Sequence, residues 1–234
     1  MVRVQTDSVH RVLSCAKLCL KVDTFPLLAA GKKEALAALV SRVLAENEVV
    51  NLTAMRTEEK CWVGNVIDSL SFLDILTKIG LSQEPANLLD LGTGGGFPLL
   101  PLAICLPTWK CMGLDATRKK VEAVARIVAA LSLPNVQTHW GRAEMLGQEK
   151  EWKNQYDIVT VRAVASIAEN LKMAAPFVRS GGCIVLWKSL HIAEELTESA
   201  DTQKETKCTL VLEHQYELPD PYGKRQLLVF KKSG

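Results

Sequence analysis

The sequence predicts an α/β protein with a doubly wound, mostly parallel sheet that contains one antiparallel strand, preceded by a helical N-terminal extension. Three observations support this fold class. From residue 86 onward, short strand-like runs alternate with longer stretches of helical periodicity. Most of these runs are almost continuously apolar, as in strands that helices cover on both faces. Upstream, residues 8–78 have the apolar spacing of amphipathic helices.

The helical extension contains two amphipathic stretches. The first, residues 32–48, has aliphatic residues three and four positions apart, so they share one face; they are Leu36, Leu39, Val40 and Val43. The second, residues 57–80, begins with Thr57 as a candidate N-cap followed by two acidic residues. Its apolar face contains Trp62, Val66, Leu70, Phe72 and Leu73.

The alternating part of the chain gives the order of the sheet elements. Strands are expected at 86–91, 110–116, 135–140, 156–162, 183–189, 208–218 and 225–232. Helices are expected at 98–106, 117–132 and 166–180. The turn-rich sequence PDPYG joins the last two strands and predicts a hairpin, which supplies the antiparallel strand.

Composition excludes several classes of protein. A net charge of +2 is too small for a protein whose whole surface binds nucleic acid. Any RNA contacts would therefore come from local basic patches. The seven cysteines form no Cys-x-x-Cys pair and are expected to be buried and reduced, and the four scattered histidines predict no metal site.

No apolar run reaches the roughly 18 residues of a membrane span. Lys17 interrupts a possible signal sequence, and the scarcity of acids near the N-terminus only faintly suggests a transit peptide, so we expect a cytoplasmic protein.

The stretch NLLDLGTGGGFP, residues 87–98, places a glycine-rich turn directly after the first predicted strand. Such turns contact nucleotides at the carboxyl ends of strands. A P-loop is excluded because no lysine follows the last glycine. A dinucleotide fingerprint starting at Gly92 would require Gly or Ala where Phe97 stands, and Asp90 would repel a pyrophosphate.

S-adenosyl-L-methionine fits this turn better. It has no phosphate, and it carries an ammonium, a carboxylate and a sulfonium, so the acid Asp90 favours it. Gly92, Gly94 and Gly96 allow the backbone to approach the ligand closely. Asp115, at the end of the second strand, is placed to accept hydrogen bonds from both ribose hydroxyls. The alternatives at this point are a plain tight turn and a nicotinamide enzyme.

The residues at the end of the fourth predicted strand exclude some classes of methyl acceptor. Enzymes that methylate exocyclic amines of bases carry an Asn/Asp-Pro-Pro-aromatic turn there, whereas this chain has TVRAVAS. Carbon methylation of pyrimidines needs a nucleophilic cysteine on a substrate loop, and no cysteine is so placed. The remaining chemistry uses an acceptor that is already a nucleophile.

At this point several motifs occur together in one order: NLTAMR (51–56), VIDSL (66–70), LLDLGTGGGFP (88–98), GLDATRKK (113–120), GRAE (141–144), VRAVAS (161–166) and LWK (186–188). Over residues 44–232 the chain resembles the bacterial GidB/RsmG family, which methylates N7 of a guanine in small-subunit (16S) ribosomal RNA. The resemblance implies a Rossmann-like class I methyltransferase. It divides the chain into a helical N-terminal extension, residues 1–80, and an S-adenosylmethionine-dependent methyltransferase domain, residues 81–234.

The resemblance also assigns cofactor contacts. Besides the turn glycines Gly92 and Gly94, they are Phe97, Asp115, Ala143, Glu144 and Arg162. Each has a structural alternative: Phe97 as a core side chain, and Glu144 as a solvated acid at a helix start. Arg162 ends a buried-looking strand and therefore needs a partner.

Four residues depart from the family pattern, at Asn65, Leu99, Ser189 and Gln226. We expect them at or near surfaces that meet RNA.

A guanine N7 carries a free lone pair and no proton, so no general base is expected and no residue is assigned as a proton-transfer catalyst. Catalysis then depends on alignment and on a site that tolerates a cationic product. The resemblance implies 16S ribosomal RNA or the small ribosomal subunit as the partner, and we expect a monomer. Basic clusters at 118–120, at 224–225 and at 231–232 are candidate phosphate contacts or plain solvated surface. Lys188 is a candidate contact to RNA or to guanine O6.

Two other classes stay open. One is a methyltransferase that acts on a small molecule or a protein. The other is a non-catalytic ribosome-binding module that keeps only the fold.

Overall fold

The structure is a computed structural model that describes residues 28–81, 85–162 and 165–234 of the 234-residue chain. In these residues, one sheet of seven strands has the order β3-β2-β1-β4-β5-β7-β6. Its strands are β1 (Asn87–Leu91), β2 (Lys110–Asp115), β3 (Val136–Trp140), β4 (Tyr156–Arg162), β5 (Val178–Lys188), β6 (Cys208–Leu218) and β7 (Gly223–Lys232).

Strand direction in the sheet follows the predicted pattern. β1 pairs in parallel with β2 and β4, β2 with β3, and β4 with β5. β7 is antiparallel to both of its neighbours, β5 and β6. The prediction of a mostly parallel sheet with one antiparallel strand from a closing hairpin is therefore confirmed.

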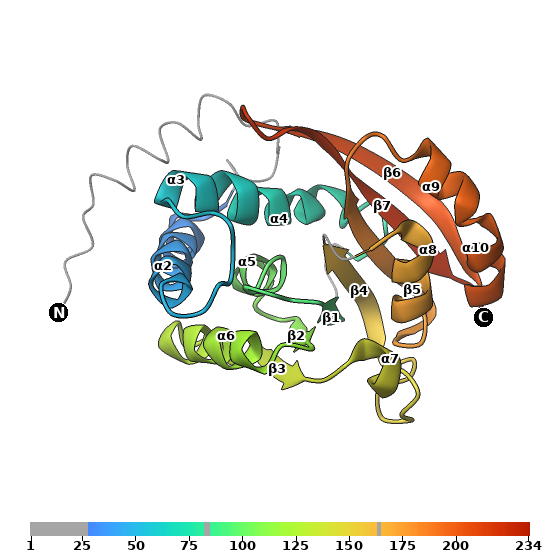
Figure 1. Ribbon diagram of the computed structural model, residues 1–234, viewed down its shortest axis with the longest axis horizontal. Helices are drawn as coiled ribbons and strands as arrows, with labels where there is room; N and C mark the ends of the chain where they lie inside the picture. The colour runs from blue at the N-terminus through green and yellow to red at the C-terminus, as the bar shows by residue number, and fades with distance from the viewer. Residues whose placement is uncertain (1–27, 82–84, 163–164) are drawn as a thin grey trace.

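Helices cover both faces of the sheet, as Figure 1 shows. One face carries α2 (Ala30–Asn47), α3 (Glu58–Cys61), the π-helix η2 (Trp62–Ile67), α4 (Asp68–Leu70), the 3-10 helix η3 (Ser71–Ile75), α5 (Leu99–Cys105) and α6 (Arg118–Ala130). The other face carries α7 (Ala143–Leu146), α8 (Ile167–Ala174), α9 (Ala193–Glu198) and α10 (Ala200–Thr206). Alternate strand residues enter the two cores: Leu88 and Val185 face the first, and Leu89 and Ile184 the second.

In the first helix of the N-terminal segment, the predicted apolar face is buried. All four predicted face residues of α2 are fully buried: Leu36, Leu39, Val40 and Val43. The Thr57 side chain caps α3 by accepting a hydrogen bond from the Lys60 amide, at 3.3 Å. Residues 48–57, however, form a loop between two helical stretches, and residues 8–27 of the predicted helical region lie outside the described residues. In the second stretch, Leu73 is only half-buried.

Two neighbouring predicted boundaries are wrong. The helix expected over 166–180 ends at Ala174, and β5 begins at Val178, five residues earlier than the strand expected from residue 183. Pro176 explains the stop, because proline disfavours a helical residue before it and lacks an amide donor. α7, α9 and α10 were not predicted, and α9 has no buried residue that would have produced an apolar period.

Candidate functional site

The glycine-rich turn lies at the carboxyl ends of β1 and β2. The amides of Gly92 and Thr93 both donate to the Leu114 carbonyl, at 2.8 and 3.0 Å, and so tie the turn to β2. Gly92, Gly94 and Gly96 have φ values of +69°, +55° and +88°, a left-handed conformation that glycine adopts without steric cost. The turn therefore presents bare backbone at Gly92, which is exposed, and at Gly94, which is half-buried.

Gly95 has a different role, because it allows a neighbouring loop to pack on the turn. A Cβ at this position would lie 2.9 Å from the Leu52 carbonyl oxygen. The loop that contains Leu52 is held by Asn47, whose Oδ1 accepts from the amides of Leu52 and Thr53 at 2.8 and 3.0 Å. The NLTA motif, residues 51–54, thus fixes the loop that covers one side of the glycine turn.

Asp115, the predicted ribose-binding carboxylate, is in contact with the turn. Its Oδ2 accepts from the Gly94 amide at 2.8 Å, and its Oδ1 accepts from the Thr117 amide at 2.7 Å. Each carboxylate oxygen can accept a further hydrogen bond. The side chain is almost buried, so these bonds hold the carboxylate in one orientation.

Asp90 lies beneath the turn, with only 1% of its surface exposed. Thr160 donates to its Oδ1 at 2.8 Å, whereas its Oδ2 has no hydrogen-bond partner. Burial raises the pKa of Asp90 to about 6, and hydrogen bonds and the nearby Arg162 oppose the rise. A buried carboxylate with an unpaired oxygen is the arrangement that a cationic ligand would stabilise.

Arg162 has the partner that its position at the end of β4 requires. Its Nε lies 3.0 Å from the Oδ2 of Asp68, and its Nη2 donates to the carbonyl of Gly64 and to the Oδ1 of Asn65. Gly64 and Asn65 belong to the π-helix η2. The Nη1 of Arg162 is buried without a partner, so its two N–H donors remain for a ligand.

Asp68 connects three parts of the fold. It is fully buried, and besides Arg162 it accepts from the hydroxyl of Tyr216 at 2.6 Å and pairs with Nη1 of Arg225 at 3.4 Å. Burial and the Asp68 carboxylate raise the pKa of Tyr216, which therefore stays a hydroxyl donor. Sequence reasoning included Asp68 in the VIDSL motif but gave it no role. The missed signal was an acid among apolar helix positions, which needs a cation nearby.

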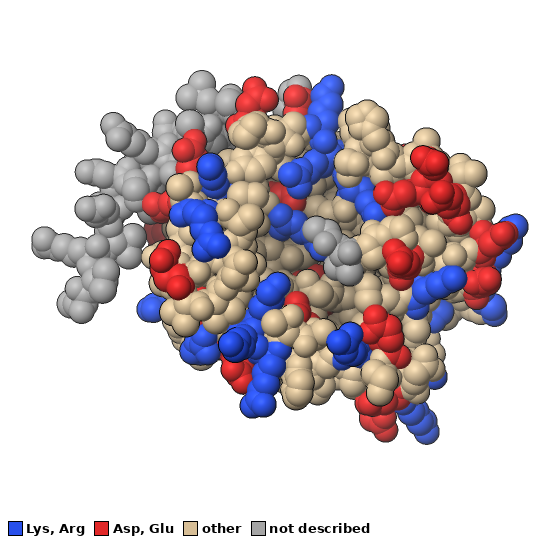
Figure 2. Space-filling model, in the orientation of Figure 1, with Lys and Arg blue, Asp and Glu red and all other residues tan. Residues whose placement is uncertain are grey.

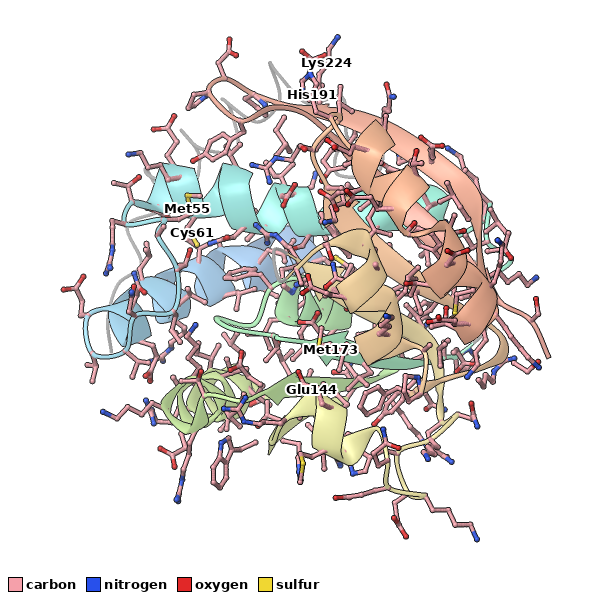
Figure 3. The ribbon with its side chains drawn as sticks, turned by 45° about the vertical axis from the view of Figure 1, so that its right-hand side comes forward. Met55, Cys61, Glu144, Met173, His191 and Lys224 are labelled. Carbon is pink, nitrogen blue, oxygen red and sulfur yellow. The ribbon has the colours of Figure 1, made fainter. Side chains whose placement is uncertain are left out.

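The remaining predicted contacts, Phe97, Ala143 and Glu144, lie in different surroundings. Phe97 is buried in the first core, as its structural alternative proposed. Ala143 and Glu144 line a cavity of about 400 Å³ between α7 and α8, and Figure 3 shows Glu144 close to Met173 of α8. Arg162 lines a second cleft of about 630 Å³ together with Asn170, Lys188 and Arg225. Ala165 lines both hollows, so the cavity at Ala143 and Glu144 adjoins the cleft at Arg162.

Lys188 is engaged inside the protein. Its Nζ lies 2.7 Å from Glu195 Oε2 and donates to the Ala165 carbonyl at 2.8 Å. The same Glu195 oxygen accepts from the Ile167 amide, so the pair joins β5, α8 and α9.

The four departures from the family pattern do not gather on an RNA-facing surface. Asn65, Leu99 and Gln226 are buried, at 5%, 0% and 2% exposure, and only Ser189 is exposed. Gln226 Nε2 donates to the Ser189 carbonyl at 2.8 Å, so two of these positions contact each other. Asn65 donates to Thr53 Oγ1 at 2.9 Å, which links η2 to the NLTA loop. Three of the four side chains are therefore not at the surface itself but packed beneath it, and only Ser189 lines the cleft at Arg162.

Charge is distributed unevenly around the hollow at the centre of the face in Figure 2. Basic side chains lie over the start of α6 and over the β6–β7 turn, where Lys119 and Lys224 are exposed. Acidic side chains are frequent over α9 and α10, on the right of the view; they include Glu194, Glu198, Asp201 and Glu205. The candidate phosphate contact at 231–232 is only partly available, because Lys232 Nζ donates to the carbonyls of Ala175 and Val178 at 2.7 and 3.0 Å.

Comparison with known proteins matches residues 32–223 to the family described as GidB, rRNA small subunit methyltransferase G. The chain belongs to the GidB family. It is 38% identical over 210 residues to the ribosomal RNA small subunit methyltransferase G of Deinococcus radiodurans, covering 90% of this chain and 81% of that protein. The protein of the same name from Carboxydothermus hydrogenoformans is 36% identical over 190 residues, with 81% of this chain and 79% of that protein covered.

Solved structures similar to this GidB-family chain support its fold. A putative O-methyltransferase from Klebsiella pneumoniae superposes with a TM-score of 0.55 at 17% identity, covering 84% of this chain and 90% of that chain. A SAM-dependent methyltransferase from Aquifex aeolicus gives a TM-score of 0.50 at 16% identity, with 67% and 87% covered. The fold is that of class I methyltransferases. Among the described residues, no helix of this GidB-family chain is long and apolar enough to span a membrane, and no cluster of His, Cys, Asp and Glu has the make-up of a metal site.

Proposed function

We propose that this chain transfers a methyl group from S-adenosyl-L-methionine to N7 of a guanine in 16S ribosomal RNA. The observation that carries the proposal is the joint presence of a glycine turn closed by Asp115 and an arginine held at the end of β4, in a chain of the GidB family. The substrate is the small-subunit RNA, naked or assembled, and we place the reaction in the cytoplasm with a monomeric enzyme. We also propose that residues 81–234 form the methyltransferase domain, with residues 1–80 as its helical extension.

The polar atoms left without partners support the choice of cofactor. Among the described residues, Asp90 Oδ2 and Arg162 Nη1 are buried near the carboxyl ends of β1 and β4 and make no hydrogen bond. Leaving such atoms unpaired costs free energy, which a ligand with matching groups would recover. Asp90 suits an ammonium or a sulfonium, and Arg162 suits a carboxylate. S-adenosylmethionine contains all three groups.

The residues of the site would hold and orient the cofactor and the methyl acceptor. None of them has to transfer a proton. S-adenosylmethionine supplies an electrophilic methyl group on a positively charged sulfur. The Asp115 carboxylate and the bare backbone of the glycine turn would hold the ribose and the amino acid part. Asp90 lies beneath the turn and supplies negative charge, which favours a cationic ligand. Guanine N7 needs no deprotonation, so the site requires no general base.

Transfer of labelled methyl groups to 16S ribosomal RNA tests the proposal. The RNA should come from cells that lack this protein, both as free RNA and as isolated small subunits, and the product should be mapped for N7-methylguanine. We expect one labelled guanine in at least one of the two substrates. Label on a protein or small molecule, with none in RNA, would favour a different acceptor. A chain that binds neither S-adenosylmethionine nor S-adenosylhomocysteine would be a ribosome-binding module without catalysis.

A further inference from the structure

Trp140 is the last residue of β3, an edge strand of the sheet, and it is unusually exposed for its type. Its exposed fraction is 55%, whereas Trp62, Trp109 and Trp187 are between 1% and 7% exposed. Large aromatic side chains are buried on average, because they contribute more apolar area to a core than other residues do. The exposure of this indole at the carboxyl ends of the strands, where we propose that the cofactor binds, therefore requires an explanation.

The indole is held in place although it is exposed. Its Nε1 donates to the Ala116 carbonyl at 3.0 Å, and the guanidinium of Arg118 lies 5.5 Å from the ring centroid. Arg118 is oriented in turn by Glu122, with its Nε 2.8 Å from the carboxylate. A ring with a fixed plane loses little conformational entropy when a ligand stacks on it.

Three basic side chains lie close to Trp140 in space or in the chain. Arg118 and Lys119 are exposed at the start of α6, and Arg142 is exposed just after β3. Basic side chains gather at the start of α6 in Figure 2, on the opposite side of the central hollow from the acidic α9–α10 region. Basic groups interleaved with an exposed aromatic ring are typical of surfaces that bind single-stranded RNA.

Strand register places this surface beside the site. Trp140 pairs with Asp115 across β2 and β3, so the indole starts one strand away from the carboxylate proposed to bind the ribose. We propose that Trp140 is a stacking platform for an unpaired nucleotide of the ribosomal RNA substrate, with Arg118, Lys119 and Arg142 contacting the adjoining phosphates. This inference rests on the proposed function and adds to it the direction in which the RNA leaves the site, along the outer edge of β3.

Substitution of Trp140 tests the platform. Trp140→Ala should weaken binding of unmethylated 16S ribosomal RNA, free or in small subunits, by about 5- to 150-fold, the loss expected for one base stacked on an aromatic ring. Trp140→Phe keeps a stacking ring without the indole donor and should retain most of the affinity. Val211→Ala is the matched control, because Val211 is 53% exposed on β6, the opposite edge strand, and its removal should change nothing.

Salt dependence separates stacking from charge. Trp140→Ala should leave the slope of log affinity against log salt concentration unchanged, because no cation is lost. Arg118→Gln should make this negative slope shallower by about 0.7, because one cation is lost. Calorimetric binding of S-adenosylhomocysteine should be the same for Trp140→Ala and the wild type.

Three results would overturn the inference or its basis. Equal RNA binding by Trp140→Ala and the wild type would remove the stacking role while leaving the methyltransferase proposal intact. A fall in cofactor affinity as large as the fall in RNA affinity would assign the indole to the adenine of the cofactor instead. A wild-type protein that binds neither free RNA nor subunits would overturn the proposed function together with this inference.

Discussion

The Nε of Arg162 lies 3.0 Å from the Oδ2 of Asp68, and this pair joins the end of β4 to the N-terminal helical segment. Because Asp68 is fully buried and Arg162 is largely so, neither charge has water to replace its partner. Asp68→Asn should therefore lower the free energy of unfolding by about 3–5 kcal/mol and reduce methyl transfer.

Tyr216→Phe is the control for this substitution. It removes only the hydroxyl that donates to Asp68 at 2.6 Å and leaves both arginines paired, so its cost should be about 1–3 kcal/mol. Urea unfolding of the three proteins measures the difference. Equal stability of Asp68→Asn and the wild type would mean that the ion pair contributes nothing.

Asp115→Ala should weaken binding of S-adenosylmethionine by about 1–3 kcal/mol, since the ligand hydroxyls lose a charged acceptor. The change also removes the acceptor of the Gly94 amide, so the glycine turn should become more mobile. Asp115→Asn keeps one acceptor oxygen and should bind with intermediate affinity. Calorimetry with S-adenosylmethionine, S-adenosylhomocysteine and NAD provides the measurement, and preferential NAD binding would contradict the assignment.

Asp90→Asn should stabilise the protein without its cofactor near pH 7.5 and weaken cofactor binding. The pKa of Asp90 is raised from 3.8 to about 6, so the folded state holds a proton that the unfolded state has lost between these values. Stability from this group is present at low pH and is lost as pH rises through about 6. Removing the charge should add about 1–3 kcal/mol at pH 7.5 and almost nothing near pH 4. Thermal unfolding at both pH values checks the prediction, and an equal effect at both would show that charge is not the cause.

Charge reversal separates RNA contacts from cofactor contacts. Lys119→Glu with Lys120→Glu, and separately Lys224→Glu, should weaken RNA binding and flatten its salt dependence while cofactor affinity stays constant. Arg225 is left unchanged, because its guanidinium pairs with Asp68 and a carboxylate there would meet another carboxylate. Lys204→Glu on α10, in the acid-rich region, is the control. RNA affinity that survives both reversals would make these lysines ordinary solvated surface.

Single-turnover methyl transfer at saturating cofactor and RNA should be flat over roughly pH 6.5 to 8, since no base has to be deprotonated. Cofactor affinity should fall as pH decreases below about 6, where Asp90 gains a proton and loses the charge that favours a cationic ligand. A tenfold loss of the saturated rate between pH 8 and 6.5 would indicate an acceptor that must lose a proton.

The sequence predicted the order of the sheet elements well because most of the strand-like runs are apolar and alternate with stretches of helical periodicity. It also located Asp115 beside the glycine turn, since the carboxyl ends of adjacent parallel strands meet at one edge. It did not predict that Asp68 pairs with Arg162, because the two are far apart in the chain and neither has a local partner. The short helices α9 and α10 were missed for a different reason: they are stabilised by contacts with β6 and α8 rather than by their own periodicity.

The position of β7 between β5 and β6 has a consequence for how the chain folds during synthesis. β7 follows the other six described strands in the chain, yet it separates β5 from β6 and pairs with both. Until β7 leaves the ribosome, β5 has an open edge, and β6 lacks the partner that holds it in the sheet. Such edges invite pairing with other chains. The edge of β5 therefore stays open to pairing with other chains until residues 223–232 have left the ribosome.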